Sequence, residues 1–131
     1  MILVDTSAWI EVLRGRHRER FASLAPSHEI VTCLPVIQEV LQGFDNFAVQ
    51  RVARAALNAI PTIEEPLTRP VFEEAISLFL AARRAGLTVR SGADCLIAAC
   101  AIRNDAMVLH VDRDFEKLMQ VSALRTLNLS G

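Results

Sequence analysis

The amino-acid sequence predicts an α/β domain in which a mainly parallel central sheet is flanked by helices, as in an α/β/α sandwich. Short apolar runs alternate along the chain with longer segments whose apolar residues recur at a helical period. This alternation is typical of parallel sheets, because a helix returns the chain between one parallel strand and the next. The chain has 131 residues, of which 52% are hydrophobic, and this suits a single domain over residues 1–131.

The first half of the chain contains capping and stop signals for three helices. Asp5-Thr6-Ser7 offers N-cap side chains for a helix that ends at Gly15. Pro35 suits the first turn of a second helix, and Gly43 suits its end. We expect strands over residues 2–4 and 29–32, and helices over residues 9–13, 35–43 and 46–59.

The second half repeats the pattern with longer helices. Thr68 and Ser91 suit two helix N-caps, and Gly86 suits the end of the longer helix. We expect strands over residues 60–64, 107–111 and 124–129, and helices over residues 70–85, 93–103 and 112–121. The apolar residues expected to face inward from the longest helix are Val71, Ile76, Phe79 and Leu80.

Composition excludes several classes of protein. No apolar run is long enough for a membrane span, and the N-terminus does not resemble a signal peptide, so a cytoplasmic protein is expected. Cys33, Cys95 and Cys100 have no C-x-x-C spacing and are expected to be reduced thiols. The net charge of −1 excludes a strongly basic nucleic-acid coat, although 13 of the 14 basic residues are arginine, which suits phosphate contacts as well as a solvated surface.

Four carboxylates occupy positions that suit a functional site. Asp5 and Asp112 each follow a predicted strand, at the sheet edge where parallel folds bind ligands. Asp94 and Glu39 lie within apolar helical segments, where a carboxylate needs a partner. Each acid also has a simpler interpretation: Asp5 and Asp112 as helix caps, Asp94 as a favourable charge at a helix N-terminus, and Glu39 as an exposed helical position. Four converging carboxylates would repel one another without a cation, and all-oxygen ligands suit Mg²⁺ or Mn²⁺ rather than zinc.

Other catalytic arrangements have little support in the sequence. Ser7 does not lie in a G-x-S-x-G turn, and the chain contains neither a P-loop nor a G-x-G-x-x-G motif. A phosphatase with Asp5 as nucleophile would want a second acid at the position that Ser7 occupies. His110 precedes Asp112 but suits a structural role better than a catalytic one.

Four segments that contain these acids resemble one protein family. They are Ile2-Leu3-Val4-Asp5-Thr6-Ser7-Ala8-Trp9-Ile10, Gln38-Glu39-Val40-Leu41-Gln42-Gly43, Ala93-Asp94-Cys95-Leu96-Ile97-Ala98-Ala99 and Asp112-Arg113-Asp114-Phe115. In order and spacing they resemble the motifs of PIN-domain ribonucleases, specifically the VapC-type toxins of VapBC toxin–antitoxin modules. One departure is local, since His110-Val111 stands where many relatives have Thr-Asn.

The resemblance implies a Mg²⁺-dependent endoribonuclease, in which Mn²⁺ can substitute, that inhibits translation and growth by cutting a loop of transfer or ribosomal RNA. It implies a catalytic set of Asp5, Glu39, Asp94 and Asp112, with Asp5, Asp94 and Asp112 holding the metal. Asp114 is a fifth acid of less certain role, and Thr6 or Ser7 commonly supports such a site.

The resemblance also implies partners, and leaves one functional alternative. The family's toxins bind a VapB-type antitoxin and usually form homodimers; no membrane partner is implied. An antitoxin groove could form from residues near Trp9, Ile10 and Leu13 together with Val36, Leu41 and Phe44, although core packing suits Trp9 better.

Two arginine-rich stretches, residues 14–20 and 83–90, suit either phosphate contacts or a solvated helix face. The alternative function is a PIN-fold binding module without catalysis.

Overall fold

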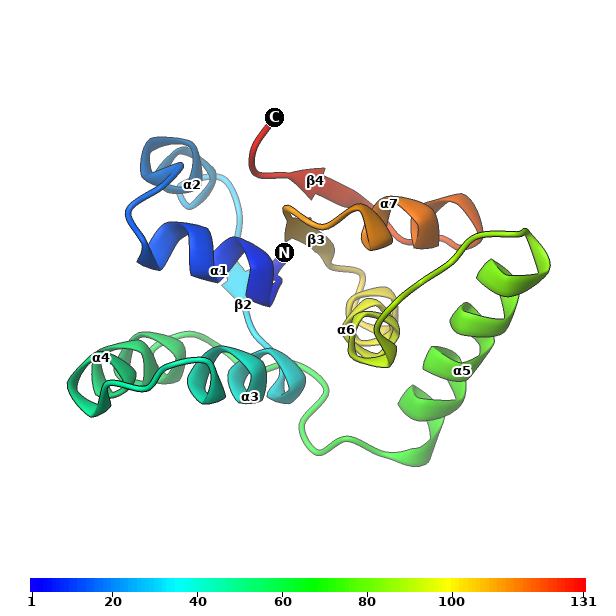
Figure 1. The fold of residues 1–131 in the computed structure, drawn as a ribbon, viewed down its shortest axis with the longest axis horizontal. Coiled ribbons are helices and arrows are strands. Elements are labelled where there is room, and N and C mark those ends of the chain that lie inside the picture. Colours follow the sequence, from blue (N-terminus) through cyan, green and yellow to red (C-terminus); the bar gives the residue numbers. More distant parts are fainter.

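A computed structural model describes all residues from 1 to 131 and contains a single sheet of four parallel strands (Figure 1). The strand order is β2-β1-β3-β4. The strands are β1 (Ile2–Val4), β2 (Ile30–Val31), β3 (Met107–His110) and β4 (Thr126–Asn128). The predicted α/β class with a parallel sheet is therefore confirmed, although the second and last strands are shorter than expected.

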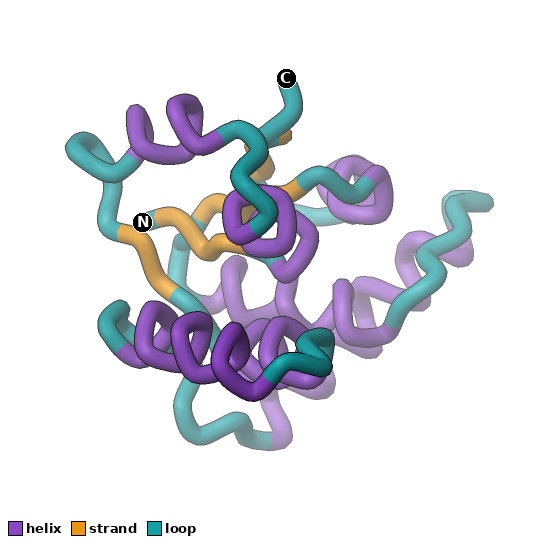
Figure 2. The backbone as a smooth tube through the Cα atoms, turned by 60° about the vertical axis from the view of Figure 1, so that its left-hand side comes forward, coloured by secondary structure: helices purple, strands orange, loops and turns teal.

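Seven helices flank this sheet, and Figure 2 shows them on both sides of the strands. They are α1 (Thr6–Leu13), α2 (Arg18–Leu24), α3 (Leu34–Gln42), α4 (Phe47–Asn58), α5 (Arg69–Arg84), α6 (Gly92–Arg103) and α7 (Arg113–Gln120). None of them is both long and apolar enough to cross a membrane.

The core is formed by the two central strands and by α6. All three residues of β1 are inaccessible to solvent, as expected for a parallel strand that is covered on both faces. Helix α6 is buried over most of its length and carries small side chains from Ala98 to Ala101, so neighbouring elements pack closely around it. Because α6 lies inside the protein, its first turn brings a carboxylate, Asp94, into a largely buried position.

Several predicted helix ends agree with the structure. The Asp5 side chain accepts a hydrogen bond from the Ser7 amide at the start of α1, and Ser91 accepts one from the Ala93 amide at the start of α6. Gly86 has a φ of 76° directly after α5, which is a conformation that glycine adopts at low cost. By contrast, Thr68 occupies the N-cap position of α5 but makes no capping hydrogen bond through its side chain.

The prediction of a strand over residues 60–64 was wrong. Only one isolated bridge forms there, between Thr32 and Thr62. Pro61 lacks the amide hydrogen that a strand needs, and Glu64 has a positive φ of 54° that bends the chain away. No separate helix was predicted over the arginine-rich segment after Gly15, but part of it forms the short, exposed helix α2, which agrees with the solvated helix face considered for this stretch.

The inward face of α5 was only partly predicted. Val71 is fully buried, but Ile76 is 52% exposed and Leu80 is 36% exposed. The buried residues of this helix are instead Val71, Ala75, Leu78 and Ala82. Phe72, Ile76 and Leu80 lie four residues apart and form an exposed stripe, which we call the α5 patch.

Candidate active site

Two of the predicted site residues lie at the same edge of the sheet. Asp5 follows β1 directly, and Asp112 lies two residues after the end of β3. Since β1 and β3 are adjacent and parallel, their carboxyl ends meet at one edge, and the Asp5 amide donates a hydrogen bond of 2.9 Å to Leu109 on β3. Both acids also cap the helix that follows, α1 for Asp5 and α7 for Asp112. The capping interpretation of these residues is thus compatible with a place in the site.

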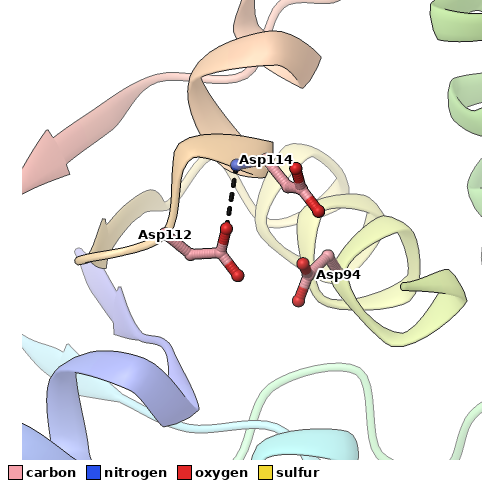
Figure 3. Close-up of side chains that lie close together, drawn as sticks. All are labelled: Asp94, Asp112 and Asp114. Atoms are coloured by element: carbon pink, nitrogen blue, oxygen red, sulfur yellow. Dashed lines mark hydrogen bonds between the residues drawn. The ribbon is translucent and has the colours of Figure 1, made fainter. Parts of the chain in front are cut away.

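Three aspartates come together beside this edge. Asp94, from the first turn of α6, lies opposite Asp112 and Asp114, from the start of α7 (Figure 3). One carboxylate oxygen from each residue lies within 4.8 Å of the others. The Asp114 amide donates a hydrogen bond of 2.9 Å to Asp112 and fixes the orientation of that carboxylate. This arrangement presents several oxygen ligands to one point in space.

Asp94 is the acid with the least support from the protein. It is 7% exposed, and burial is the main reason why its pKa rises from 3.8 to about 8. The negative charges of Asp5, Asp112, Asp114 and Glu39 raise the pKa further, in that order. The four other acids therefore all act on Asp94, although the five residues come from four separate regions of the chain. A buried carboxylate in such a field requires either a proton or a cation.

Asp5 is held firmly through one oxygen only. Its Oδ2 accepts hydrogen bonds from the Ser7 amide at 3.0 Å and the Ser7 hydroxyl at 2.5 Å, whereas Oδ1 is buried without any partner. Burial raises the pKa of Asp5 to about 6. Hydrogen bonds from Ser7 and from the Thr6 amide oppose this rise in pKa, whereas the negative charge of Glu39 adds to it. The unpaired Oδ1 atom is thus available to a ligand that the protein itself does not provide.

Glu39 reaches the site from α3 and is oriented by α1. The Thr6 hydroxyl donates a hydrogen bond of 2.9 Å to Oε1 of Glu39, which leaves Oε2 free of side-chain bonds. Glu39 is half-buried and lines an open pocket of about 420 Å³ together with Gln38 and Phe72. It is therefore not the fully exposed helical residue that the simpler interpretation of the sequence described.

Asp114 differs from the other acids because both of its oxygens are paired. Oδ2 accepts a hydrogen bond of 3.0 Å from the Arg90 amide, and Oδ1 lies 3.2 Å from the Lys117 ammonium. Burial alone would raise the pKa of Asp114, but these hydrogen bonds and the two positive charges hold it below the ordinary value. Lys117 was not predicted to support the site, although a lysine three residues after an aspartate on one helix is placed to pair with it.

Ser7 and His110 connect the site to the end of β3. The Ser7 hydroxyl accepts a hydrogen bond of 3.1 Å from the Val111 amide while it donates to Asp5. The buried His110 ring accepts a hydrogen bond of 3.1 Å at Nδ1 from the Asp112 amide, and burial lowers its pKa, so the ring is neutral. The ring also packs against Phe115, with ring centroids 5.4 Å apart, and its Nε2 atom is buried without a hydrogen-bond partner.

Comparison with known proteins identifies the family of this chain. A family model described as the PIN domain matches residues 2–119. The chain belongs to the PIN domain family.

Individual relatives of this PIN domain protein agree with that result. The chain is 35% identical over 132 aligned residues to Ribonuclease VapC11 of Mycobacterium tuberculosis, and equally so to VapC ribonuclease Mb1587 of Mycobacterium bovis. The alignment covers 95% of this chain and 96% of each relative.

Solved structures show the same fold. Superposition on a chain of VapBC2 from Rickettsia felis, solved bound to a promoter DNA fragment, gives a TM-score of 0.78 at 18% identity and covers 98% of both chains. A chain of VapBC-1 from nontypeable Haemophilus influenzae gives a TM-score of 0.76 at 17% identity, with both chains covered completely.

The acids of this PIN domain suit a hard divalent cation. Only carboxylate oxygens converge at the site, and the nearest imidazole nitrogen, Nδ1 of His110, is occupied by the Asp112 amide. Mg²⁺ and Mn²⁺ prefer such oxygen ligands, whereas zinc sites usually contain histidine or cysteine. A bound cation would pair the buried Oδ1 of Asp5 and offset the repulsion that raises the pKa of Asp94.

Proposed function

We propose that this PIN domain protein is a divalent-metal-dependent endoribonuclease and the toxin of a type II toxin–antitoxin module. In the cytoplasm it would cut a loop of transfer or ribosomal RNA and so inhibit translation and growth. The names of the relatives support a ribonuclease. The observation that carries the proposal is the convergence of Asp94, Asp112 and Asp114, whose carboxylate oxygens lie within 4.8 Å of one another around the buried Asp94.

Asp5, Asp94 and Asp112 are the residues that we propose as metal ligands. A bound Mg²⁺ would lower the pKa of its water and neutralise charge on the reacting phosphate. Glu39 has a different part, because Thr6 fixes its Oε1 and leaves Oε2 to orient an attacking water or to accept its proton. Ser7 holds Asp5 in place, and Asp114 supports the site through its contacts with Arg90 and Lys117.

RNA cleavage by the purified chain tests this proposal. We expect discrete cuts in total cellular RNA with Mg²⁺ or Mn²⁺, no cuts with EDTA, and at least a hundredfold slower cleavage by Asp94→Asn or Asp5→Asn. Asp45→Asn removes an exposed carboxylate on a loop and is the matched control. Calorimetric titration with Mn²⁺ provides a second measurement. A folded parent chain that neither cuts RNA nor binds Mn²⁺ would refute the enzyme and favour the non-catalytic binding module.

We also propose a site for the antitoxin between α1 and α3. A small groove of about 220 Å³ lies there and is lined by Ile10, Leu13, Arg14, Val40, Gly43 and Phe44. Trp9 is not part of it, because this residue is buried and packs against Phe21 with ring centroids 5.5 Å apart. An apolar groove between two helices suits an amphipathic helix of a partner protein.

The α5 patch is the surface that we propose for a homodimer. Phe72, Ile76 and Leu80 expose 46%, 52% and 36% of their surface and border an apolar cleft of about 440 Å³ between α5 and α6. A stripe with a four-residue spacing can pack against its own copy across a two-fold axis. We expect light scattering to give a dimer for the parent and a monomer for Ile76→Glu. Ser77→Glu, an exposed residue next to Ile76 but outside the patch, should leave the dimer intact.

A further inference from the structure

One cation lies directly against the acidic site with most of its side chain in solvent. Arg90 is 74% exposed, yet its Nη2 atom lies 3.6 Å from Asp112 and its Nε atom lies 3.6 Å from Asp114. These distances are too long for hydrogen bonds, so the guanidinium donors remain free. No other arginine of the chain forms an ion pair with a site acid.

The backbone of Arg90 is fixed although its side chain is free. The Arg90 amide donates a hydrogen bond of 3.0 Å to Asp114, and the neighbouring Val89 is buried. The Lys117 ammonium links the same carboxylate to the carbonyl oxygen of Thr88 at 2.7 Å. Asp114 therefore anchors residues 88–90 to the start of α7, and this anchoring sets the position from which the guanidinium projects.

We propose that Arg90 binds a backbone phosphate of the RNA beside the acidic site and that Asp114 is the residue that positions it. This inference rests on the proposed function, because it takes RNA as the substrate. A cluster of five acids repels RNA, and a single arginine at its edge supplies attraction where the strand must approach. Guanidinium groups bind phosphate through paired hydrogen bonds, whereas exposed ion pairs at 3.6 Å are weak and are readily exchanged for a phosphate.

The two arginines that lie nearest to Arg90 in the sequence have other surroundings. The Arg83 guanidinium stacks on the Phe79 ring, 4.9 Å from its centroid. Arg84 borders a groove between α5 and α7 that also contains Glu73 and Glu74. Arg84 is exposed, carries the same charge as Arg90 and forms no ion pair with Asp112 or Asp114, so Arg84→Ala is a matched control.

Binding of a fluorescent single-stranded RNA oligonucleotide, measured in EDTA over a range of salt concentrations, tests the role of Arg90. We expect Arg90→Ala to weaken binding about tenfold and to reduce the salt slope by about 0.7, the value of one phosphate contact. Arg90→Lys should recover the salt slope but only part of the affinity, and Arg84→Ala should change neither. Equal affinity and slope for Arg90→Ala and the parent would overturn the proposal.

The role of Asp114 is tested by a double-mutant cycle in the same binding assay. If Asp114 acts through Arg90, Asp114→Asn weakens RNA binding, and the double variant with Arg90→Ala binds no more weakly than Arg90→Ala alone. Additive losses would overturn the positioning role. A chain that binds RNA through Arg90 but neither cuts it nor binds Mn²⁺ would uphold this inference and refute the proposed enzyme. A chain whose Arg90→Ala variant binds and cuts RNA like the parent would refute the inference alone.

Discussion

Replacing Asp94 with asparagine should stabilise the metal-free protein at neutral pH, by an amount that follows from the environment of this carboxyl group. Its pKa is about 8 in the folded chain, against 3.8 for an ordinary aspartate. Between these pH values the folded protein keeps a proton that the unfolded chain releases, so the free energy of unfolding falls as pH rises. The fall is about 1.4 kcal/mol per pH unit and amounts to about 4 kcal/mol at pH 7. The asparagine variant avoids this loss.

Urea unfolding in EDTA measures the effect, with fluorescence of the single tryptophan, Trp9, as the probe. The advantage of Asp94→Asn over the parent should grow from about 2 kcal/mol at pH 5 to about 5 kcal/mol at pH 8. Added Mn²⁺ should raise the stability of the parent more than that of the variant, because the cation binds only the native carboxylates.

The dependence on pH is what makes this experiment decisive. A change of side-chain shape at Asp94 would shift stability by the same amount at every pH, whereas removal of a group with a raised pKa gives a difference that increases with pH. Parallel stability curves for the parent and Asp94→Asn between pH 5 and 8 would refute the reasoning. The exposed control Asp45→Asn should follow the parent throughout.

Residues around the acids should affect rate, partner binding and stability separately. Thr6→Val removes the 2.9 Å hydrogen bond to Glu39. We expect single-turnover RNA cleavage by this variant to slow about tenfold or more, with unchanged RNA affinity, and we expect Thr6→Ser to recover the rate. Leu13→Glu places a charge in the groove between α1 and α3, so calorimetry should show at least tenfold weaker antitoxin binding while RNA cleavage stays normal. Asp114→Asn should lower the free energy of unfolding at pH 7. Because the pKa of Asp114 lies below the ordinary value of 3.8, the stability that this carboxylate contributes is lost as pH falls below that value. The difference in stability between the variant and the parent should therefore vanish in acid.

The sequence was most informative where one local rule decided the structure. The apolar runs at residues 2–4 and 107–110 are strands because no other element buries so short an apolar segment on both faces. Asp5 and Asp112 could be placed at one sheet edge because parallel strands fix where their ends meet. Glu39 lies far from these strands in the sequence, and its motif, rather than any local pattern, indicated its place in the set.

The sequence was least informative where distant segments decide the outcome. Helix α5 has apolar residues on more than one face, and only its packing on α6 determines that Leu78 is buried and Ile76 is exposed. The segment over residues 60–64 has the apolar character of a strand, but no neighbour pairs with it beyond Thr32. Arg90 belonged to an arginine-rich stretch that suited several roles, and only the hydrogen bond between its amide and Asp114 shows which acids it faces.

The order of the strands determines how late during synthesis the acidic site can assemble. Strand β1 emerges first from the ribosome, but one of its two neighbours, β3, begins only at Met107, and the register pairs Ile2 with that residue. Asp5 is therefore made more than 100 residues before Asp112, and the two meet only when β3 and the start of α7 have been translated. A nascent chain interrupted before that point carries the first acids without the last ones. The acidic site is thus assembled only after the chain has been translated past Asp114.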